Sequence, residues 1–355
     1  MIETIEHKEK WVEQLAKIGN TDFYFTYDYH HLSKSEGEQP ILLKYTQGNQ
    51  SILFPLLLRN ISGTEYKDAI SVYGYAGILT NDNSSNINAS EFQKSLKAFF
   101  VEKNIVSVFS RLHPFMDAQE DLLEGLGEIT EQGMVVYIDL TLPIDVQRAN
   151  FNRRLKTYLN KGRKICTVIE GNHQEDLKKF IELYHENMRR VDATDSYFFN
   201  EEYFERILAS KDYTPQLMIC KDNETQKTIG GAIFIKKDNI VQYHLSGLDA
   251  DFFDLNPIKL IIDEMRLKSV EEGYTYLNLG GGRGGSNEDS LFRFKSGFSK
   301  NFKNFKLWKY IVDEKVYKKL TINHFSKFPG TSSNNISFFP LYRANISEFS
   351  NEIEV

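Results

Sequence analysis

Five glycines near the end of the sequence could hold a negatively charged ligand. They lie between Gly280 and Gly285 and follow an apolar stretch, Tyr274–Leu279, that is typical of a buried strand. Backbone without Cβ atoms lets a ligand approach closely. A helix is predicted to open at Ser286, with Asp289 three residues on as in a capping box, and the first N–H groups of a helix attract negative charge. The spacing therefore predicts a strand, a tight loop and a helix N-terminus that together suit an anionic group.

The predicted helix also carries one charged side chain among apolar ones. Lys295 has Leu291, Phe292 and Phe298 as its i−4, i−3 and i+3 neighbours, so its aliphatic stem lies on an apolar face. Two interpretations stay open. The ammonium reaches out to water, as many lysines do, or it is held in place for a chemical purpose.

A predicted strand, Ile240–Leu248, contains two further candidates. Tyr243 and His244 are neighbours, so their side chains are expected on opposite faces of the sheet. An imidazole such as that of His244 titrates near neutral pH and could relay a proton, and a buried, hydrogen-bonded imidazole is an equal alternative. Tyr243 is either a functional side chain or a half-buried aromatic residue of the sheet.

Cations are concentrated on the predicted helix Val146–Lys164, although the protein as a whole is acidic. A helix face rich in arginine suits bidentate contacts to phosphate, as in a sugar-nucleotide diphosphate or the acceptor end of an RNA. The alternative is a solvated amphipathic helix. A second predicted helix, Gln174–Arg190, ends in Arg189 and Arg190, where cations also complement the helix dipole. The basic side chains of the first helix are Arg148, Arg153, Arg154, Lys156, Lys161, Arg163 and Lys164.

Composition excludes several classes of protein. The 355 residues are enough for two domains with cores of their own, and a net charge of −6 gives no general attraction to DNA. Cys166 and Cys220 lack metal-type spacing, and no metal-binding, P-loop or nucleophile-elbow motif occurs. The start, Met1–Lys17, has no signal-peptide core, and the longest apolar run, Ile52–Leu58, is too short to span a bilayer. A cytoplasmic location is expected.

The two halves of the chain share one order of elements. Each half reads as one or more helices, three strands, a helix, a strand, a helix and a final strand. The turn signals place the boundary near Thr141–Pro143. The predicted domains are residues 1–140 and 141–312, followed by a partly irregular segment, 313–355, that is expected to pack back on the first domain.

That order matches the GNAT acyltransferase core, and the chain resembles a known group. The group comprises the Fem-type peptidoglycan cross-bridge aminoacyltransferases and the related FemAB-like tandem-GNAT acyltransferases. The resemblance implies an α/β protein of the α+β type, with two GNAT-like domains whose sheets are mixed and mostly antiparallel. The chain lacks the long coiled-coil arm of the larger cross-bridge enzymes. The resemblance spans about Trp11 to Ile311 and rests on Tyr73–Gly77, Arg111–Pro114, Tyr184–Arg189, Tyr197-Phe198, Gly230–Phe234, Tyr243–Ser246, Gly280–Gly282 and Phe294–Phe298.

What the resemblance implies is transfer of an acyl or aminoacyl group from an activated ester or thioester to a primary amine. Phe294-Lys295 matches the family's Phe-Lys pair, with the ammonium stabilising the oxygen of the tetrahedral intermediate. Tyr243 is similar in position to a tyrosine of the substrate channel, and His244 is carried as a second catalytic candidate. The acceptor would be a cell-wall (peptidoglycan) precursor, small or lipid-linked, which leaves peripheral membrane association open. The substrate-binding candidates are Tyr75, Arg111, Arg153, Arg154, Arg189, Arg190, Tyr197, Gly281, Gly282 and Arg283.

The acyl donor is predicted from a missing motif. GNAT enzymes that use coenzyme A carry a glycine-containing loop at the position of Asp251–Pro257, where this chain has two aspartates and no glycine. This favours aminoacyl-tRNA over acyl-CoA as donor, with no permanently bound cofactor. Two alternatives stay open: an acyl-CoA-dependent N-acyltransferase that acts on an amino sugar of a surface polysaccharide, and a tandem-GNAT binding protein without catalysis.

Overall fold

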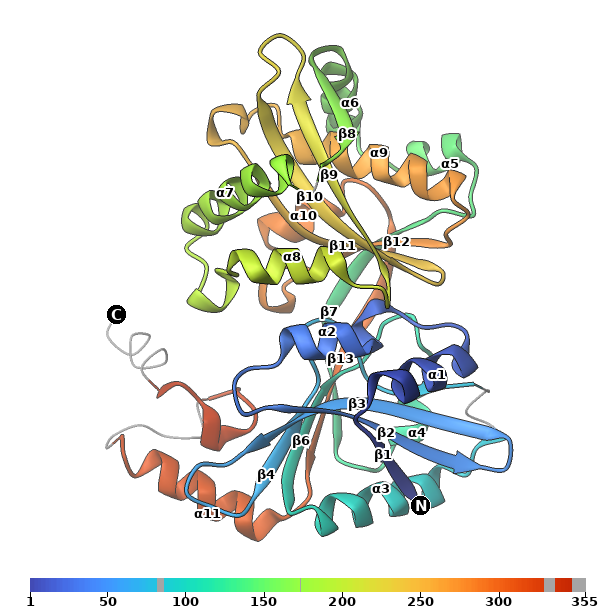
Figure 1. The fold of residues 1–355 in the computed structure, drawn as a ribbon, viewed down its shortest axis with the longest axis vertical. Coiled ribbons are helices and arrows are strands. Elements are labelled where there is room, and N and C mark those ends of the chain that lie inside the picture. Colours follow the sequence, from blue (N-terminus) through green and yellow to red (C-terminus); the bar gives the residue numbers. More distant parts are fainter. Residues whose placement is uncertain (82–85, 173, 329–335, 347–355) are drawn as a thin grey trace. The chain divides into compact units, whose positions relative to one another are not determined.

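The computed structural model describes residues 1–81, 86–172, 174–328 and 336–346. The chain divides into two compact units (Figure 1). Unit 1 consists of Met1–Ile18, Ser33–Glu131 and the chain from Lys306 on, and unit 2 consists of Gly19–Leu32 and Gln132–Phe305. Residues 329–335 and 347–355 of the predicted C-terminal segment lie outside the described residues.

These units differ from the predicted ranges because two long strands contain the boundaries. The strands β7 (Glu128–Asp139) and β13 (Asn301–Ile311) each begin in one unit and end in the other, so no turn residue marks the change. The early segment Gly19–Leu32 belongs to unit 2. There Thr21 donates from its backbone N–H and its hydroxyl to the Asp238 carboxylate, at 2.8 and 2.6 Å.

Unit 1 is built on a mixed sheet in the order β1-β2-β3-β4-β6-β13, with β5 beside β3. All of these neighbours are antiparallel except β4 and β6, which are parallel. Besides β13, the strands are β1 (Ile2–Ile5), β2 (Gln39–Gln47), β3 (Gln50–Asn60), β4 (Lys67–Ile70), β5 (Leu79–Thr80) and β6 (Ile105–Arg111).

Amphipathic helices cover this sheet. In α3, Phe92, Leu96 and Phe99 recur at helical spacing and are buried, and Asn88 begins the helix by accepting a hydrogen bond from the Glu91 N–H at 3.2 Å. The helices of unit 1 are α1 (Lys8–Ile18), α3 (Ala89–Glu102), α4 (Gln119–Leu123), α11 (Glu314–Phe325) and the 3-10 turn η7 (Leu341–Arg343).

The last described residues pack on unit 1 through a buried carboxylate. Asp68 accepts hydrogen bonds from the Tyr342 hydroxyl, at 3.1 Å, and from the guanidinium groups of Arg343 and Arg59. The Tyr342 hydroxyl also lies 2.7 Å from the Ser107 hydroxyl of β6. These contacts fix η7 against the sheet.

The strands of unit 2 lie in the order β7-β12-β11-β10-β9-β8. Its neighbours are antiparallel except β11 and β12, which are parallel. Both units thus have mixed, mostly antiparallel sheets, as predicted. Besides β7, the strands are β8 (Cys166–Glu170), β9 (Thr214–Asp222), β10 (Thr228–Lys237), β11 (Ile240–Leu248) and β12 (Tyr276–Gly280).

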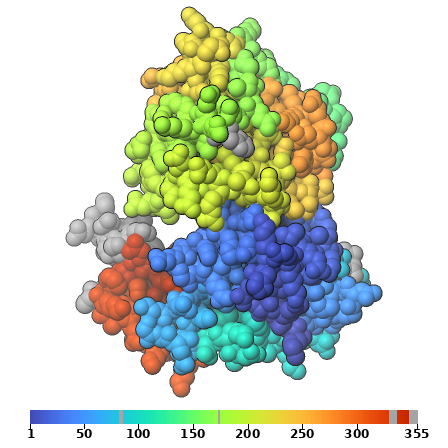
Figure 2. Space-filling model, viewed as in Figure 1, coloured from blue at the N-terminus to red at the C-terminus, as the bar shows by residue number. Residues whose placement is uncertain are grey.

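Two glycines in β10 allow helices to approach both faces of this sheet. A Cβ on Gly230 would lie 2.8 Å from Pro257 of α9, and one on Gly231 would lie 2.8 Å from Phe180 of α7. The side chains of α7 and α8 lie on the face of unit 2 that Figure 2 shows. The helices of unit 2 are α2 (Tyr27–Ser33), α5 (Ile144–Ala149), α6 (Arg153–Ile165), α7 (Glu175–Arg190), α8 (Glu201–Ala209), α9 (Pro257–Glu271) and α10 (Ser290–Lys295), with 3-10 turns η1 (Phe23–Phe25), η3 (Asp195–Tyr197), η4 (Ala250–Phe252) and η5 (Arg283–Gly285).

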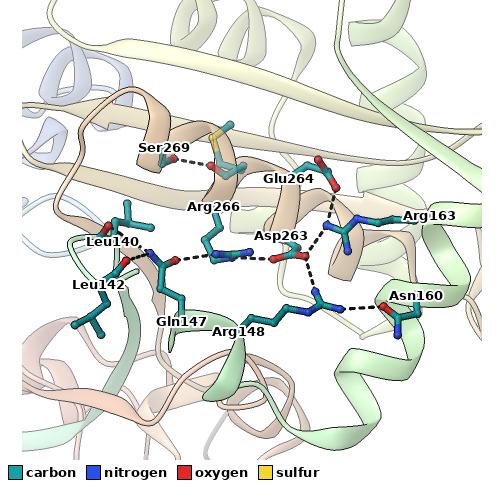
Figure 3. A network of polar contacts seen from close by, with 11 residues as sticks. Leu140, Leu142, Gln147, Arg148, Asn160, Arg163, Asp263, Glu264, Arg266 and Ser269 are labelled. Carbon is teal, nitrogen blue, oxygen red and sulfur yellow. Dashed lines mark hydrogen bonds and ion pairs between the residues drawn. The ribbon is translucent and has the colours of Figure 1, made fainter. Parts of the chain in front are cut away.

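A buried polar network joins α5, α6 and α9 (Figure 3). At its centre the Asp263 carboxylate binds the guanidinium of Arg266 at 2.8 Å and that of Arg163 at 2.7 Å. Arg266 also donates to the Gln147 side chain at 2.9 Å, and both Asp263 and Arg266 are almost fully buried. The buried charges are therefore paired and hydrogen-bonded, as burial requires. In the described part of the chain, no helix is both long and apolar enough to cross a membrane.

Candidate active site

Strands β11 and β12 are paired over three residues and then separate. The register runs from Ile240–Tyr276 to Gln242–Asn278, after which β11 continues beside β10 alone. Residues 243–246 of β11 are half-buried, although β11 lies inside the sheet order. The first residue of β11 beyond the paired region is Tyr243.

A β-bulge at His244 brings two hydroxyl groups together. Tyr243 and Leu245 pair with successive residues of β10, so His244 between them has no partner in the ladder. Side chains three apart on a regular strand point to opposite faces. The extra residue instead lets Tyr243 and Ser246 meet, and their hydroxyls are hydrogen-bonded. Burial raises the pKa of Tyr243 to about 12, against a smaller opposing effect of Ser246. The phenol is thus protonated at neutral pH.

Lys295 is the last residue of α10 and is only 8% exposed. Its ammonium donates a hydrogen bond to the Gly281 carbonyl, at 2.7 Å, just beyond the end of β12. Burial lowers the pKa of Lys295 to about 8, and the nearby Asp289 carboxylate partly opposes this. The ammonium is therefore held inside the protein and does not extend into water. Phe294 and Tyr243 pack against the same hydrophobic core as Phe292 of α10.

The glycine loop is tied to α10 by one carboxylate. Asp289 accepts a hydrogen bond from the Phe292 N–H at 2.7 Å, as an N-cap, and its other oxygen accepts from the Arg283 N–H. A Cβ on Gly282 would lie 2.3 Å from the Asp289 carboxylate, so this position needs glycine. The predicted helix start at Ser286 is wrong. The helix begins at Ser290, because Asp289 is itself the N-cap.

The side chain of Arg283 connects the loop to the end of α7. Its guanidinium donates to the carbonyl oxygens of Val191 and Asp192, at 3.1 and 3.4 Å. On the other side of the loop, a Cβ on Gly281 would lie 2.8 Å from the Met134 carbonyl of β7. Backbone elements therefore hold the loop from two directions, which fixes the Gly281 carbonyl that binds Lys295.

His244 lies in a different set of contacts from Tyr243 and Lys295. Its Nε2 is 3.2 Å from the Tyr203 hydroxyl of α8, and its ring packs edge-on against Phe23 and Tyr29. Burial lowers the pKa of His244 to about 3, so the imidazole is neutral. The structure thus packs Phe294, which precedes Lys295, and Tyr243 against one core, and it places His244 in an aromatic cluster of η1, α2 and α8.

The basic helix divides into two groups of side chains. Arg163 binds Asp263 and Glu264, and Arg148 lies 3.7 Å from Asp263, so both belong to the buried network (Figure 3). Arg153 and Arg154 are exposed instead. The Arg154 guanidinium lies 3.3 Å from the hydroxyl of Tyr158, and the Lys259 ammonium of α9 lies 3.6 Å from the centre of the Tyr158 ring.

The two arginines at the end of α7 also differ. Arg190 stacks on the Phe253 ring, with its guanidinium carbon 4.8 Å from the ring centre, and donates to the Asn187 side chain. Arg189 is exposed and has no side-chain partner among the described residues. Tyr197 is half-buried in η3, and its carbonyl accepts a hydrogen bond from the Tyr184 hydroxyl at 2.8 Å.

Two of the predicted substrate-binding residues lie in unit 1. Tyr75 is half-buried, and Arg111 ends β6 with its guanidinium 5.0 Å from the Phe109 ring and 6.0 Å from the Tyr73 ring. The other predicted site residues all belong to unit 2.

The loop before α9 contains carboxylates and no glycine. Asp249 accepts from the Asp251 N–H at 3.0 Å and binds the Lys227 ammonium at 2.7 Å. Asn256 precedes Pro257 with a φ of 50° and makes no side-chain cap of α9. Across the described ranges, no group of three His, Cys, Asp or Glu side chains is placed to hold a metal ion.

The chain is similar to several known proteins in sequence or in fold. Residues 211–306, which include β11, β12 and α10, match the model of the FemAB family. The crystal structure of FemX is similar, with a TM-score of 0.71 and 15% identity over 89% of this chain and 99% of that chain. The C-terminal domain of a putative lysylphosphatidylglycerol synthetase from Agrobacterium fabrum gives a TM-score of 0.55, with 13% identity over 85% of this chain and 92% of that one. A conserved protein of unknown function from Bacteroides thetaiotaomicron gives 0.54, with 10% identity over 86% and 99%. A search of curated proteins finds no match.

The fold is that of the tandem-GNAT acyltransferases, with two GNAT-type units. Residues 211–306 are similar to the FemAB family, and the fold of the chain is similar to that of FemX. The resemblance predicted from the sequence is confirmed.

Proposed function

We propose that this protein transfers an aminoacyl group from an activated ester to a primary amine of a peptidoglycan precursor. The observation that carries the proposal is the buried Lys295 ammonium. An ammonium has three N–H donors, and among the described residues only Gly281 accepts one of them. Two donors remain for an oxygen of a ligand. A cation held in this way stabilises the oxyanion of a tetrahedral intermediate.

The protonation state of Lys295 fits this role. With a pKa of about 8, the side chain is mostly charged at pH 7. Its burial reduces screening by water, so its attraction to a developing negative charge is stronger than at an exposed site. The substrate amine, which must be neutral to attack the ester, would enter where β11 and β12 separate, beside Tyr243.

The proposed donor is an aminoacyl-tRNA. The loop before α9 supports this, because its carboxylates, Asp251 and Asp254, would repel the diphosphate of coenzyme A, and no glycine allows close approach. The surface of α6 offers phosphate contacts instead. The Arg154 guanidinium and the Lys259 ammonium both lie beside the Tyr158 side chain, so two cations are close together, and a bound anion would relieve their repulsion.

The proposed acceptor is a small or lipid-linked cell-wall precursor that carries a primary amine. The FemAB-family match of residues 211–306 supports this class of acceptor. A lipid-linked acceptor would bring the protein to the membrane surface during turnover.

A donor and acceptor matrix tests the proposal. The purified protein is incubated with charged tRNA or acetyl-CoA, together with a nucleotide-linked muropeptide, its lipid-linked form or an amino sugar, and products are identified by mass. We expect a mass increase of one aminoacyl residue on a muropeptide with charged tRNA alone. Acetylation of an amino sugar by acetyl-CoA, without any reaction of charged tRNA, would replace the proposal by an N-acetyltransferase.

Binding measurements separate the donors independently of turnover. Calorimetry with acetyl-CoA should show no binding at high micromolar concentration, whereas charged tRNA should bind in a salt-sensitive way. Replacing Arg153 and Arg154 by Gln should weaken tRNA binding. The matched control replaces two exposed lysines of α3, Lys94 and Lys97, by Gln, which removes the same charge from unit 1. If both double variants weakened tRNA binding equally, the effect would be one of total charge, and α6 would no longer support the proposed tRNA donor.

A further inference from the structure

The hydrogen bond between Tyr243 and Ser246 depends on an irregularity of β11. In a regular strand these two side chains would lie on opposite faces, and the unpaired residue His244 is what allows them to meet. Bulges are over-represented next to active sites, where they redirect a side chain. The pair therefore has a structural cause that is local to the candidate site.

The pair lies where β11 has lost its neighbour. Tyr243 is the first residue beyond the register with β12, and both Tyr243 and Ser246 are half-buried. Tyr243 contacts the same hydrophobic core as Phe294, which precedes Lys295. Tyr243 and Phe294, the residue next to Lys295 in the sequence, thus pack against one core.

A count of donors shows what the pair offers. Two hydroxyls carry two protons, and their mutual hydrogen bond uses one of them. Whichever hydroxyl donates, one O–H of the pair remains for a ligand. A hydroxyl held by a second one is confined to fewer rotamers and loses less entropy when it binds.

We propose that Ser246 is a positioning residue that acts through Tyr243. Its side chain holds the Tyr243 hydroxyl at the separation of β11 and β12, where the pair donates one hydrogen bond to an oxygen of the bound acyl donor. The role of the ligand in this inference rests on the proposed function. The coupling between the two side chains does not, and it is measurable in the free protein.

The first test measures that coupling without any substrate. A ring-fluorinated tyrosine, whose phenol is more acidic, is incorporated at position 243, and its titration is followed by ¹⁹F NMR. Because the Ser246 hydroxyl lowers the pKa of Tyr243, Ser246→Ala should raise the titration midpoint, and Ser246→Thr should restore it. An unchanged midpoint in Ser246→Ala would overturn the proposal, whatever reaction the protein catalyses.

The second test uses the transfer reaction. Ser246→Ala should lower kcat by about tenfold, in line with the loss of one hydrogen bond, while Ser246→Thr retains most of the rate. In a Tyr243→Phe background, Ser246→Ala should have no further effect, because its partner is already absent. Full additivity of the two substitutions would show that Ser246 does not act through Tyr243. If the titration of Tyr243 depends on Ser246 but the protein transfers no aminoacyl group, the proposed function is refuted and the pairing of the two side chains stands.

Discussion

The Asp289 carboxylate binds the backbone N–H of Arg283, and this contact joins the glycine loop to the helix that carries Lys295. The other oxygen of the same carboxylate caps that helix. One side chain thus sets both ends of the hydrogen bond between Lys295 and Gly281, since it fixes the helix and the loop together.

Replacing Asp289 should therefore affect rate as well as stability. Asp289→Ala removes the N-cap of α10, which we expect to cost about 1 kcal/mol of unfolding free energy, and it removes the contact between α10 and the loop, which should lower kcat. Urea denaturation and steady-state kinetics measure the two effects. The control is Asp313→Ala, because Asp313 caps α11 in unit 1 through the Val316 N–H at 2.8 Å. The control should lose similar stability and keep its kcat. Equal kcat values for both variants would contradict the positioning role of Asp289.

Lys295→Met should lower kcat by about two to three orders of magnitude with little change in KM, because the lost contact acts on the transition state. Methionine retains the apolar stem, so the far-UV spectrum and the fold should be preserved. Lys300→Met, at an exposed position five residues on, is the matched control and should behave as the native protein. If Lys295→Met kept most of the activity, Lys295 would be structural only.

The pKa of Lys295 predicts how stability changes with pH. The pKa of Lys295 is about 8 in the folded protein, whereas an ordinary lysine, as in the unfolded chain, has a pKa of 10.5. The unfolded chain therefore binds the proton more tightly. Unfolding then takes up a proton between these values, and the free energy of unfolding should rise as pH rises from 8 to 10.5. The contribution is of order 3 kcal/mol. Urea denaturation at pH 7 and pH 10 should show this rise in the native protein and a smaller one in Lys295→Met. Parallel curves for the two proteins would contradict the lowered pKa.

The network of Figure 3 should matter for stability. Asp263→Ala leaves the buried Arg266 guanidinium without its carboxylate, and we expect a loss of about 3 to 5 kcal/mol in urea denaturation. Glu264→Ala removes only the half-exposed partner of Arg163 and should cost less than about 1 kcal/mol. Similar losses of unfolding free energy in both variants would show that the buried pair of Asp263 and Arg266 contributes no more to stability than the half-exposed pair of Glu264 and Arg163.

Local spacing was enough to predict some of this site. The apolar neighbours of Lys295 at i−4, i−3 and i+3 predicted a buried stem, and the order of strands and helices predicted the tandem fold. Features set by distant partners could not be predicted in this way. The cations around Arg163 in the sequence predicted phosphate binding. In the structure Arg163 is paired with Asp263, 100 residues away, which no local pattern indicates. Ser246 was missed because i and i+3 normally lie on opposite faces of a strand, and no residue type marks the bulge at His244.

The placement of β13 has a consequence for the order in which the chain can fold during synthesis. Trp308 of β13 is fully buried in the core of unit 1, and β13 pairs with β6, roughly two hundred residues earlier. Unit 1 therefore remains incomplete until the ribosome has made the whole of Gln132–Phe305. Nearly all of unit 2 is continuous in sequence. Unit 2, which contains Lys295, can therefore complete its core before β13, the last strand of unit 1, has been synthesised.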